Sequence, residues 1–316
     1  MNKKLLQTLN RSLESTKTTH YTPVTIDALQ ARLTEELDWL DADPGRECLI
    51  VLLQELAAKM RSARIVVNPG YSYLPDSYLL FLTSVTHVNP VEWDLPFSRF
   101  ILSVGNRPVI PFEVGTGGLE VARKILSGRE NELIVEPEPG LFEITFLDGI
   151  ELTSATLRLI TYPELDRFTR TLKEGWHPLD EATLKLFRRG ATDGAFFFES
   201  DKMREWLFEF DPESMSDLVL LNALYHPDRI QMYETALERK KAPASIRVYE
   251  NALINRVLRD SYALPVYQEQ ALLLKDVPNA NMMGLFNKLA PKGHFIGRTM
   301  MAVEALWPYR NKTKLK

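Results

Sequence analysis

The sequence is poor in the residues that build disulfides and metal clusters. It has one cysteine among 316 residues, and its five histidines are scattered. A single thiol excludes an internal disulfide, and no ligand spacing typical of a zinc site is present. The cysteine, Cys48, opens the apolar run 48–53, so we expect a buried and unreactive core thiol.

Net positive charge and long apolar runs are missing as well. The formal net charge is −4 and the isoelectric point is near 5.9. The chain as a whole therefore does not attract nucleic acid, and any DNA contact has to come from a local cluster of cations. No run approaches the roughly 20 apolar residues of a membrane span, and no signal-peptide core follows the N-terminus. We predict a cytoplasmic protein with no membrane partner.

Apolar residues recur at helical spacing early in the chain. The pattern predicts helices over residues 25–40 and 46–61, joined by a turn at 43–45. The run 65–67 predicts a short buried strand, whereas the polar residues 1–24 are predicted to be a loose segment.

A second patterned block occupies residues 184–227. Glycines at 190 and 194 indicate tight turns, and the apolar run 195–198 suggests a short strand. Ser200 offers a side-chain oxygen as the N-cap of a helix, and Asp211-Pro212 is expected to start a second helix that ends before Pro227. The block therefore predicts a compact helical module.

Five segments in and after this block resemble the fingers region of the alpha subunit of bacterial DNA polymerase III. In chain order they are GATDGAFFFES (190–200), MRE (203–205), DLVLLNALYHP (217–227), ERKK (238–241) and VYQEQ (266–270). Any one of them alone is a weak signal. Their shared order carries the resemblance.

The resemblance extends upstream to the palm of that family. The palm-like segments are VNPG (67–70), YLLFLT (78–83), VNP (88–90) and LPFSRF (95–100), followed by expected strands at 107–114, 141–148 and 152–160. The resemblance implies an α+β fold, in which a nucleotidyltransferase-like palm with a small mixed sheet and flanking helices precedes a mainly helical fingers-like domain.

The resemblance also implies a division of the chain into domains. We expect a palm-like domain over residues 25–165 and a fingers-like domain over 166–316. The stretch 115–140 is too short for the helical thumb of the family, so we expect the thumb to be deleted. We also expect the N-terminal phosphoesterase-like domain and the C-terminal clamp-binding and single-strand-binding parts of the family to be absent.

Polymerase chemistry needs clustered carboxylates, because they hold two magnesium ions. The positions that match the three catalytic aspartates of the family are Val109, Pro111 and Thr145, and none of these residues is an acid. The resemblance implies that they lie close together on neighbouring strands. The resemblance therefore implies lost catalysis and no metal or other cofactor.

Three acids near these positions leave an alternative open. Strand alternation puts Glu113 on the face of Val109 and Pro111, and Glu143 on the face of Thr145, with Asp148 a further candidate. They are either ordinary surface acids or a rebuilt site for Mg²⁺.

The nucleotide and DNA contacts of the family also look degenerate. The phosphate-binding turn keeps only its first glycine, at position 70, and lysines stand at the matching nucleotide-site positions Lys288 and Lys292. Two further sets of residues have two interpretations each. The first set, which is either a remnant of the nucleotide site or a group of packing and capping residues, consists of Tyr267, Gln268 and Glu269. The second set is either a DNA-binding track or a solvated helix face, and it consists of Arg239, Lys240, Lys241 and Arg247.

We therefore predict a catalytically inactive, bacterial polymerase III alpha-like protein that acts as an accessory or interaction module in DNA replication or repair. Its expected partners are another replication or repair protein and weakly, electrostatically bound DNA. Two alternatives stay open: a DNA-directed nucleotidyltransferase with a rebuilt metal site, or a structural interaction module unrelated to nucleic acid.

Overall fold

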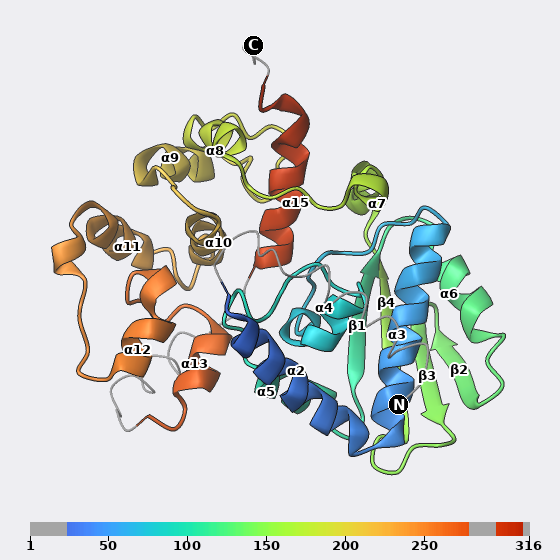
Figure 1. The fold of residues 1–316 in the computed structure, drawn as a ribbon. Helices are drawn as coiled ribbons and strands as arrows, with labels where there is room; N and C mark the ends of the chain where they lie inside the picture. Colours follow the sequence, from blue (N-terminus) through green and yellow to red (C-terminus); the bar gives the residue numbers. More distant parts are fainter. Residues whose placement is uncertain (1–23, 278–294, 312–316) are drawn as a thin grey trace. The chain divides into compact units, whose positions relative to one another are not determined.

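The computed structural model describes residues 24–277 and 295–311, and the chain divides into two compact units, Met1–Trp176 and His177–Lys316. The sequence predicted the division at residue 165. The predicted α+β class is confirmed, because unit 1 contains a small mixed sheet with helices and the described part of unit 2 is helical (Figure 1).

The sheet of unit 1 has four strands in the order β1-β4-β3-β2. The strands are β1 (Val109–Val114), β2 (Glu132–Glu138), β3 (Leu141–Phe146) and β4 (Ser154–Thr161). β1 pairs parallel to β4, and the other pairs are antiparallel. Strands β1, β3 and β4 were predicted. β2 was missed because Pro137 argues against a strand; as an edge strand with irregular pairing, however, β2 tolerates a proline.

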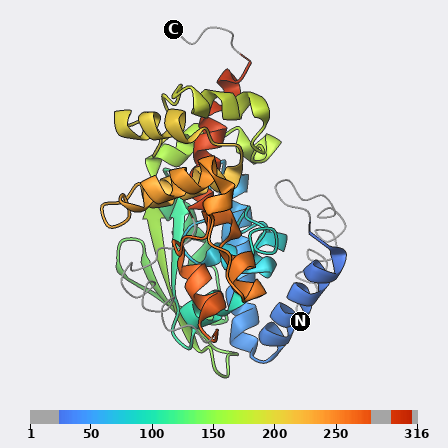
Figure 2. The ribbon, with the colours of Figure 1, turned by 90° about the vertical axis from the view of Figure 1, so that its left-hand side faces the viewer.

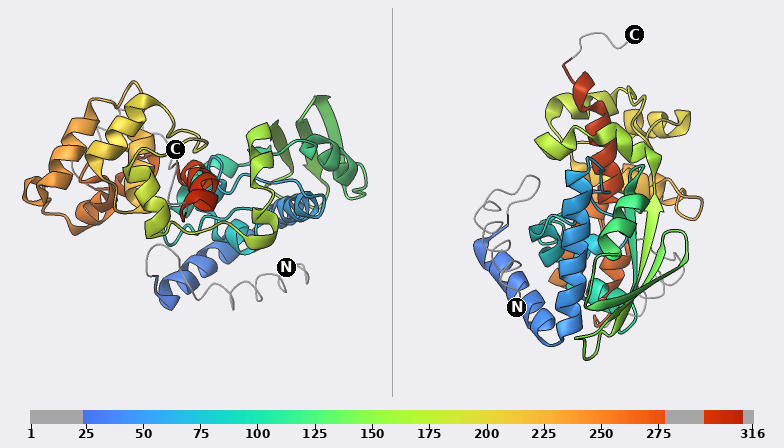
Figure 3. Two further views of the ribbon diagram at one scale, coloured as in Figure 1. Left: turned by 90° about the horizontal axis from the view of Figure 1, so that it is seen from above. Right: turned by 90° about the vertical axis from the view of Figure 1, so that its right-hand side faces the viewer.

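One face of the sheet packs on helices. The described α-helices of unit 1 are α2 (Ile26–Asp41), α3 (Pro44–Ser62), α4 (Tyr78–Leu82), α5 (Phe97–Val104), α6 (Gly118–Leu126) and α7 (Thr171–Glu174). α3 and α6 lie side by side against the sheet (Figure 3), and α2 folds back along α3 (Figure 2). The core beneath α3 and α6 includes Leu53, Leu56, Phe112, Ile144 and Leu157. The two predicted N-terminal helices are thus confirmed.

The predicted strand at 65–67 is wrong. Only Val67 forms a bridge, to Val114, and the chain then turns away. The turn begins where the Asn68 side chain accepts a hydrogen bond from the backbone N–H of Gly70 (2.9 Å). A local turn therefore ends strand pairing after one residue.

Asp43 joins the start of α3 to the loop between β3 and β4. Its carboxylate accepts backbone N–H bonds from Gly45 (2.7 Å), Ile150 (3.2 Å), Glu151 (2.8 Å) and Leu152 (2.5 Å). The loop approaches so closely that a Cβ at Gly45 would lie 1.9 Å from the Leu152 carbonyl oxygen. Burial raises the pKa of the Asp43 carboxyl, but the four donors lower it by more, so the net pKa lies below its ordinary value.

Unit 2 surrounds a helix that is buried on nearly every side. This helix, α10 (Met215–Leu224), contacts α11 (Met232–Lys241) and α15 (Ile296–Leu306). The other α-helices in the described part of unit 2 are α8 (Glu181–Arg188), α9 (Asp201–Phe210), α12 (Ala252–Val257) and α13 (Gln268–Leu274). An apolar run such as Leu218–Leu221 suits a fully enclosed helix, because every face meets protein.

The predicted N-cap of α9 is confirmed, whereas two other predictions for this part of unit 2 are wrong. Ser200 caps α9 as predicted, accepting the N–H of Met203 (3.2 Å). Residues 195–198 form turns and not a strand. The second helix begins at Met215 with Ser214 as its cap, since Asp211 takes a left-handed conformation (φ 50°) that ends α9.

Candidate functional site

The sheet of unit 1 has a second face that carries the positions matched to catalytic aspartates. In register, Val109 lies beside Thr156, which lies beside Glu143. Alternate residues of a strand point to the same side of a sheet. Val109, Pro111 and Glu113 alternate with buried residues along β1, and Glu143 and Thr145 do so along β3, as the predicted sharing of a face requires. The face is accessible, and Val109 is 49% exposed.

The strands that carry Val109 and Thr145 are not neighbours, contrary to our expectation. β4 lies between them because it pairs with both β1 and β3. The two backbones are therefore two inter-strand spacings apart, or about 10 Å in the pairing direction.

The three candidate acids do not converge. Glu113 pairs with Ile160 and Glu143 with Thr156, so they are two strands apart and offset along β4 by about 13 Å. Glu113 also accepts a hydrogen bond from the Asn68 side chain (2.6 Å). Asp148 lies beyond the end of β3. Glu113, Glu143 and Asp148 thus do not form one cluster, and the described parts of the chain contain no cluster of three or more His, Cys, Asp or Glu suited to a metal.

A small cavity of about 320 Å³ occupies the Thr145 region. It is lined by Arg107, Glu143, Ile144, Thr145, Ser154, Ala155 and Thr156. One cation, one carboxylate and three hydroxyls make a poor magnesium site, because Mg²⁺ in phosphoryl-transfer sites is held by carboxylates. Arg107 was not among the predicted site residues, although it begins the predicted strand 107–114; it lies two residues before the observed β1.

Asp148 instead lines a separate cavity of about 540 Å³ together with Cys48, Glu55, Arg129 and Glu132. The thiol of Cys48 is half-buried and not fully buried as predicted. Burial raises its pKa, and the negative charges of Glu132 and Asp148 raise it further. The thiolate is therefore disfavoured, which agrees with an unreactive thiol.

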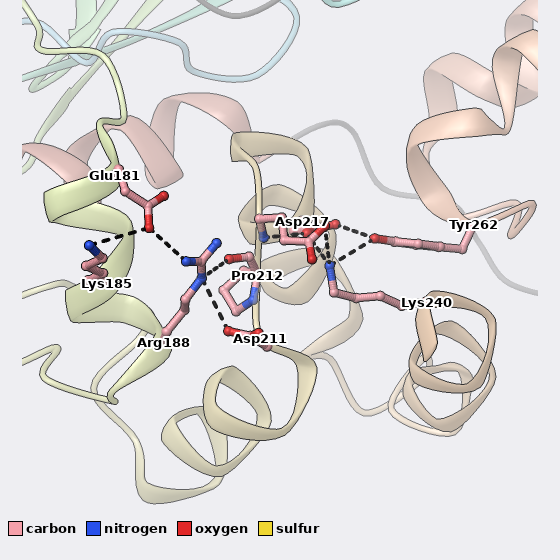
Figure 4. Close-up of polar contacts among 9 residues, drawn as sticks. Glu181, Lys185, Arg188, Asp211, Pro212, Asp217, Lys240 and Tyr262 are labelled. Carbon is pink, nitrogen blue, oxygen red and sulfur yellow. Dashed lines mark hydrogen bonds and ion pairs between the residues drawn. The ribbon is translucent and has the colours of Figure 1, made fainter. Parts of the chain in front are cut away.

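Lys240 is held inside unit 2. Its ammonium lies 3.0 Å from Asp217 Oδ2, and the Tyr262 hydroxyl donates to Asp217 Oδ1 at 2.8 Å (Figure 4). The side chains of Lys240 and Asp217 are only 11% and 6% exposed. Lys240 also lies over the Phe210 ring at 5.2 Å. Burial and the Asp217 charge raise the pKa of Tyr262, so its hydroxyl stays a donor. The network ties α10 to α11 and to the turn at residue 262.

The other candidate cations divide between internal and exposed positions. Arg239 donates to the carbonyl of Tyr262 (2.7 Å). Lys241 is 60% exposed, with Glu209 at 3.9 Å, and exposed Arg247 stacks over the Tyr249 ring at 4.8 Å. Of the four predicted DNA-contacting residues, Lys241 and Arg247 are thus the ones that present charge to solvent.

The VYQEQ segment forms the start of α13. Gln270 Oε1 accepts the backbone N–H groups of Val266 (2.8 Å) and Tyr267 (2.9 Å), and its amide nitrogen donates to Ser261 Oγ (2.7 Å). Tyr267 and Glu269 are buried, whereas Gln268 is exposed. Burial raises the pKa of Tyr267 well above its ordinary value. These contacts support the packing and capping interpretation. Lys288 and Lys292 lie outside the described residues, and a nucleotide site stays a prediction.

Sequence reasoning also missed two arginines of unit 2. Arg188 Nε donates to the carbonyl of Pro212 (2.8 Å), and the guanidinium lies 3.0 Å from Glu181 and 3.2 Å from Asp211 (Figure 4). Arg229 is 1% exposed, and burial lowers its pKa. Contacts such as those of Arg188 to residues 211 and 212 join distant positions in the sequence, so no local pattern signals them.

Residues 172–282 match the family model of the bacterial DNA polymerase III alpha subunit finger domain. All five segments singled out in the sequence fall inside this range. This part of the chain is therefore similar to a polymerase III finger domain. The predicted recognition is thereby confirmed for the fingers.

Similar relatives are DNA polymerase III alpha subunits. The protein of Bacillus subtilis (strain 168) is 34% identical over 95 residues, which are 30% of this chain and 8% of that protein. Those of Chlamydia pneumoniae and Halalkalibacterium halodurans are 28% and 31% identical over 134 residues, which are 42% of this chain and 11% and 12% of those proteins. The chain thus spans only about a tenth of the length of the curated relatives it matches. No described helix is long and apolar enough to cross a membrane.

Proposed function

We propose that the chain is a catalytically inactive polymerase III alpha-like protein that serves as an accessory or interaction module in DNA replication or repair. The observation that carries this proposal is the accessible sheet face, where Val109, Pro111 and Thr145 stand at the positions matched to catalytic aspartates. The finger-type region of unit 2, by contrast, has capped helices, a buried core and the internal Lys240–Asp217 ion pair.

The chemistry of the sheet face supports inactivity. Two-metal phosphoryl transfer needs ions about 3.5–4 Å apart, held by converging carboxylates. Valine and proline offer no side-chain ligand, and a neutral threonine hydroxyl is a poor substitute. Glu113 is held by Asn68 and lies far from Glu143 across the sheet. We therefore assign unit 1 as a palm-like domain without a metal cofactor, in which α6 and β2 replace the thumb.

The proposed partners are another replication or repair protein and DNA. DNA binding is assigned to the exposed cations Lys241 and Arg247, and it is weak because the chain carries a net charge of −4. Since such binding depends on counterion release, it falls steeply as salt rises.

Fluorescence anisotropy with a labelled primer–template at several salt concentrations tests the DNA partnership. The Lys241→Ala, Arg247→Ala variant is expected to bind several-fold more weakly and to show a salt slope reduced by about one to two. A Lys185→Ala, Lys202→Ala variant is the matched control, because both lysines are 57% exposed elsewhere in unit 2. Equal weakening by both variants would refute a localised site; no DNA binding at any salt would leave only the protein partner.

A further inference from the structure

Two consecutive phenylalanines near the start of α9 lie outside the roles described so far. The rings of Phe196 and Phe197 are 4.2 Å apart between centroids. Phe198, the next residue, is fully buried and packs edge-on against Phe187 at 5.2 Å. Phe198 therefore serves the core, whereas Phe196 remains 37% exposed.

A strained backbone brings the two rings together. Phe197 has a φ of 74°, the largest positive φ of any non-glycine residue in the described parts of the chain. A bulky side chain in this region is a genuine outlier and costs free energy of about 1–3 kcal/mol. In an extended strand the two rings would point to opposite sides. Here the strain places them on one surface.

An arginine completes this surface. The guanidinium of Arg298, on α15, lies 4.6 Å from the centroid of the Phe197 ring and 5.2 Å from that of Phe295. Within residues 24–277 and 295–311 no carboxylate forms an ion pair with Arg298. Its charge is therefore not neutralised by any carboxylate of the described residues. We call Phe196, Phe197 and Arg298 the aromatic ledge.

We propose that the aromatic ledge binds an unpaired base of single-stranded DNA. Adjacent aromatic rings accept a nucleobase by stacking, and a nearby guanidinium both stacks and attracts the neighbouring phosphate. A nucleotide fits this surface in charge as well as in shape, because it supplies both a π face for the rings and a negative charge for Arg298. An apolar peptide would leave Arg298 without an anion. This inference rests on the proposed DNA partnership but assigns a site separate from Lys241 and Arg247.

The test uses the full chain and a single-stranded oligonucleotide that contains 2-aminopurine, whose fluorescence falls when the base stacks. Binding to the wild type is expected to quench the fluorescence and to leave a component that persists at high salt. Phe196→Ala is expected to remove the quenching and to raise Kd about tenfold, while Phe196→Trp restores both. Phe208→Ala is the matched control, because Phe208 is a 77% exposed phenylalanine on α9, and it should change neither readout.

The outcomes separate this site from the proposed function. If the wild type binds DNA but Phe196→Ala behaves like Phe208→Ala with unchanged melting, the ledge assignment is refuted and the DNA partnership stands. If the wild type binds a replication protein but no single strand, the ledge assignment is refuted and the accessory function stands. Self-association that Phe196→Ala abolishes would reassign the surface to a second copy of the chain and would also refute the proposal.

Discussion

Replacing Lys240 should weaken the fold of unit 2, although its sequence context suggests a DNA contact. Lys240→Ala removes the ammonium that lies 3.0 Å from Asp217 and 3.5 Å from Glu213. Asp217 would remain almost fully buried, keeping only the Tyr262 hydroxyl, at 2.8 Å, and the Glu213 N–H, also at 2.8 Å.

The expected loss follows from what remains around Asp217. Removing one partner of a fully buried ion pair costs about 3–5 kcal/mol, because it leaves an uncompensated charge. Two hydrogen bonds still serve Asp217 here, so we expect Lys240→Ala to lower the free energy of unfolding by about 2–3 kcal/mol. The control is Lys241→Ala. Its exposed pair with Glu209 at 3.9 Å predicts a loss below about 0.5 kcal/mol.

Two measurements check this prediction. Urea denaturation of the full chain gives the loss for each variant, and a double-mutant cycle with Asp217→Ala should return a coupling of about 1–2 kcal/mol. Hydrogen exchange followed by mass spectrometry should show faster exchange in α10 and α11, with unit 1 unchanged. If the Lys240→Ala and Lys241→Ala variants have the same free energy of unfolding, the Lys240–Asp217 ion pair does not stabilise unit 2. Lys240 would then again be a candidate for DNA contact.

Two further substitutions test the capping contacts. The lowered pKa of Asp43 means that its contribution to stability is present above the unfolded value near 3.8 and is lost as pH falls through the lower folded pKa. Asp43→Ala should therefore cost about 3 kcal/mol at pH 7 and less below pH 3.8, as measured by urea titration at both pH values; a pH-independent loss would contradict an ionised cap. Gln270→Ala should cost about 2 kcal/mol, since it leaves the N–H groups of Val266 and Tyr267 unsatisfied. Faster amide exchange confined to α13 is the readout, and unchanged exchange would argue against the capping role.

Local features were predictable from the sequence because their causes lie within a few residues. The helices α2 and α3 follow from apolar spacing, and the start of α9 follows from the hydroxyl of Ser200. The start of α10 was misplaced because Pro212 competes with Ser214 as a helix-start signal. The edge strand β2 was hidden by Pro137.

Long-range pairing was not predictable in the same way. The central place of β4, which separates Val109 from Thr145, depends on the parallel β1–β4 pairing, and alternation within single strands says nothing about strand order. Lys240 belongs to a basic segment, but its partner Asp217 is 23 residues away. Because the sequence does not show which residue pairs with Lys240, it cannot distinguish a lysine in a buried ion pair from one that contacts DNA.

Primer extension tests the central claim of catalytic inactivity most directly. Purified protein is incubated with a primer–template, all four deoxynucleotides and Mg²⁺, beside a Glu113→Gln, Glu143→Gln variant purified in the same way. We predict no extension by either protein, because the acids that remain on the sheet face do not converge and electrostatic stabilisation by bound metal is the main source of such catalysis. Template-directed extension by the wild type that disappears in the double variant would contradict it.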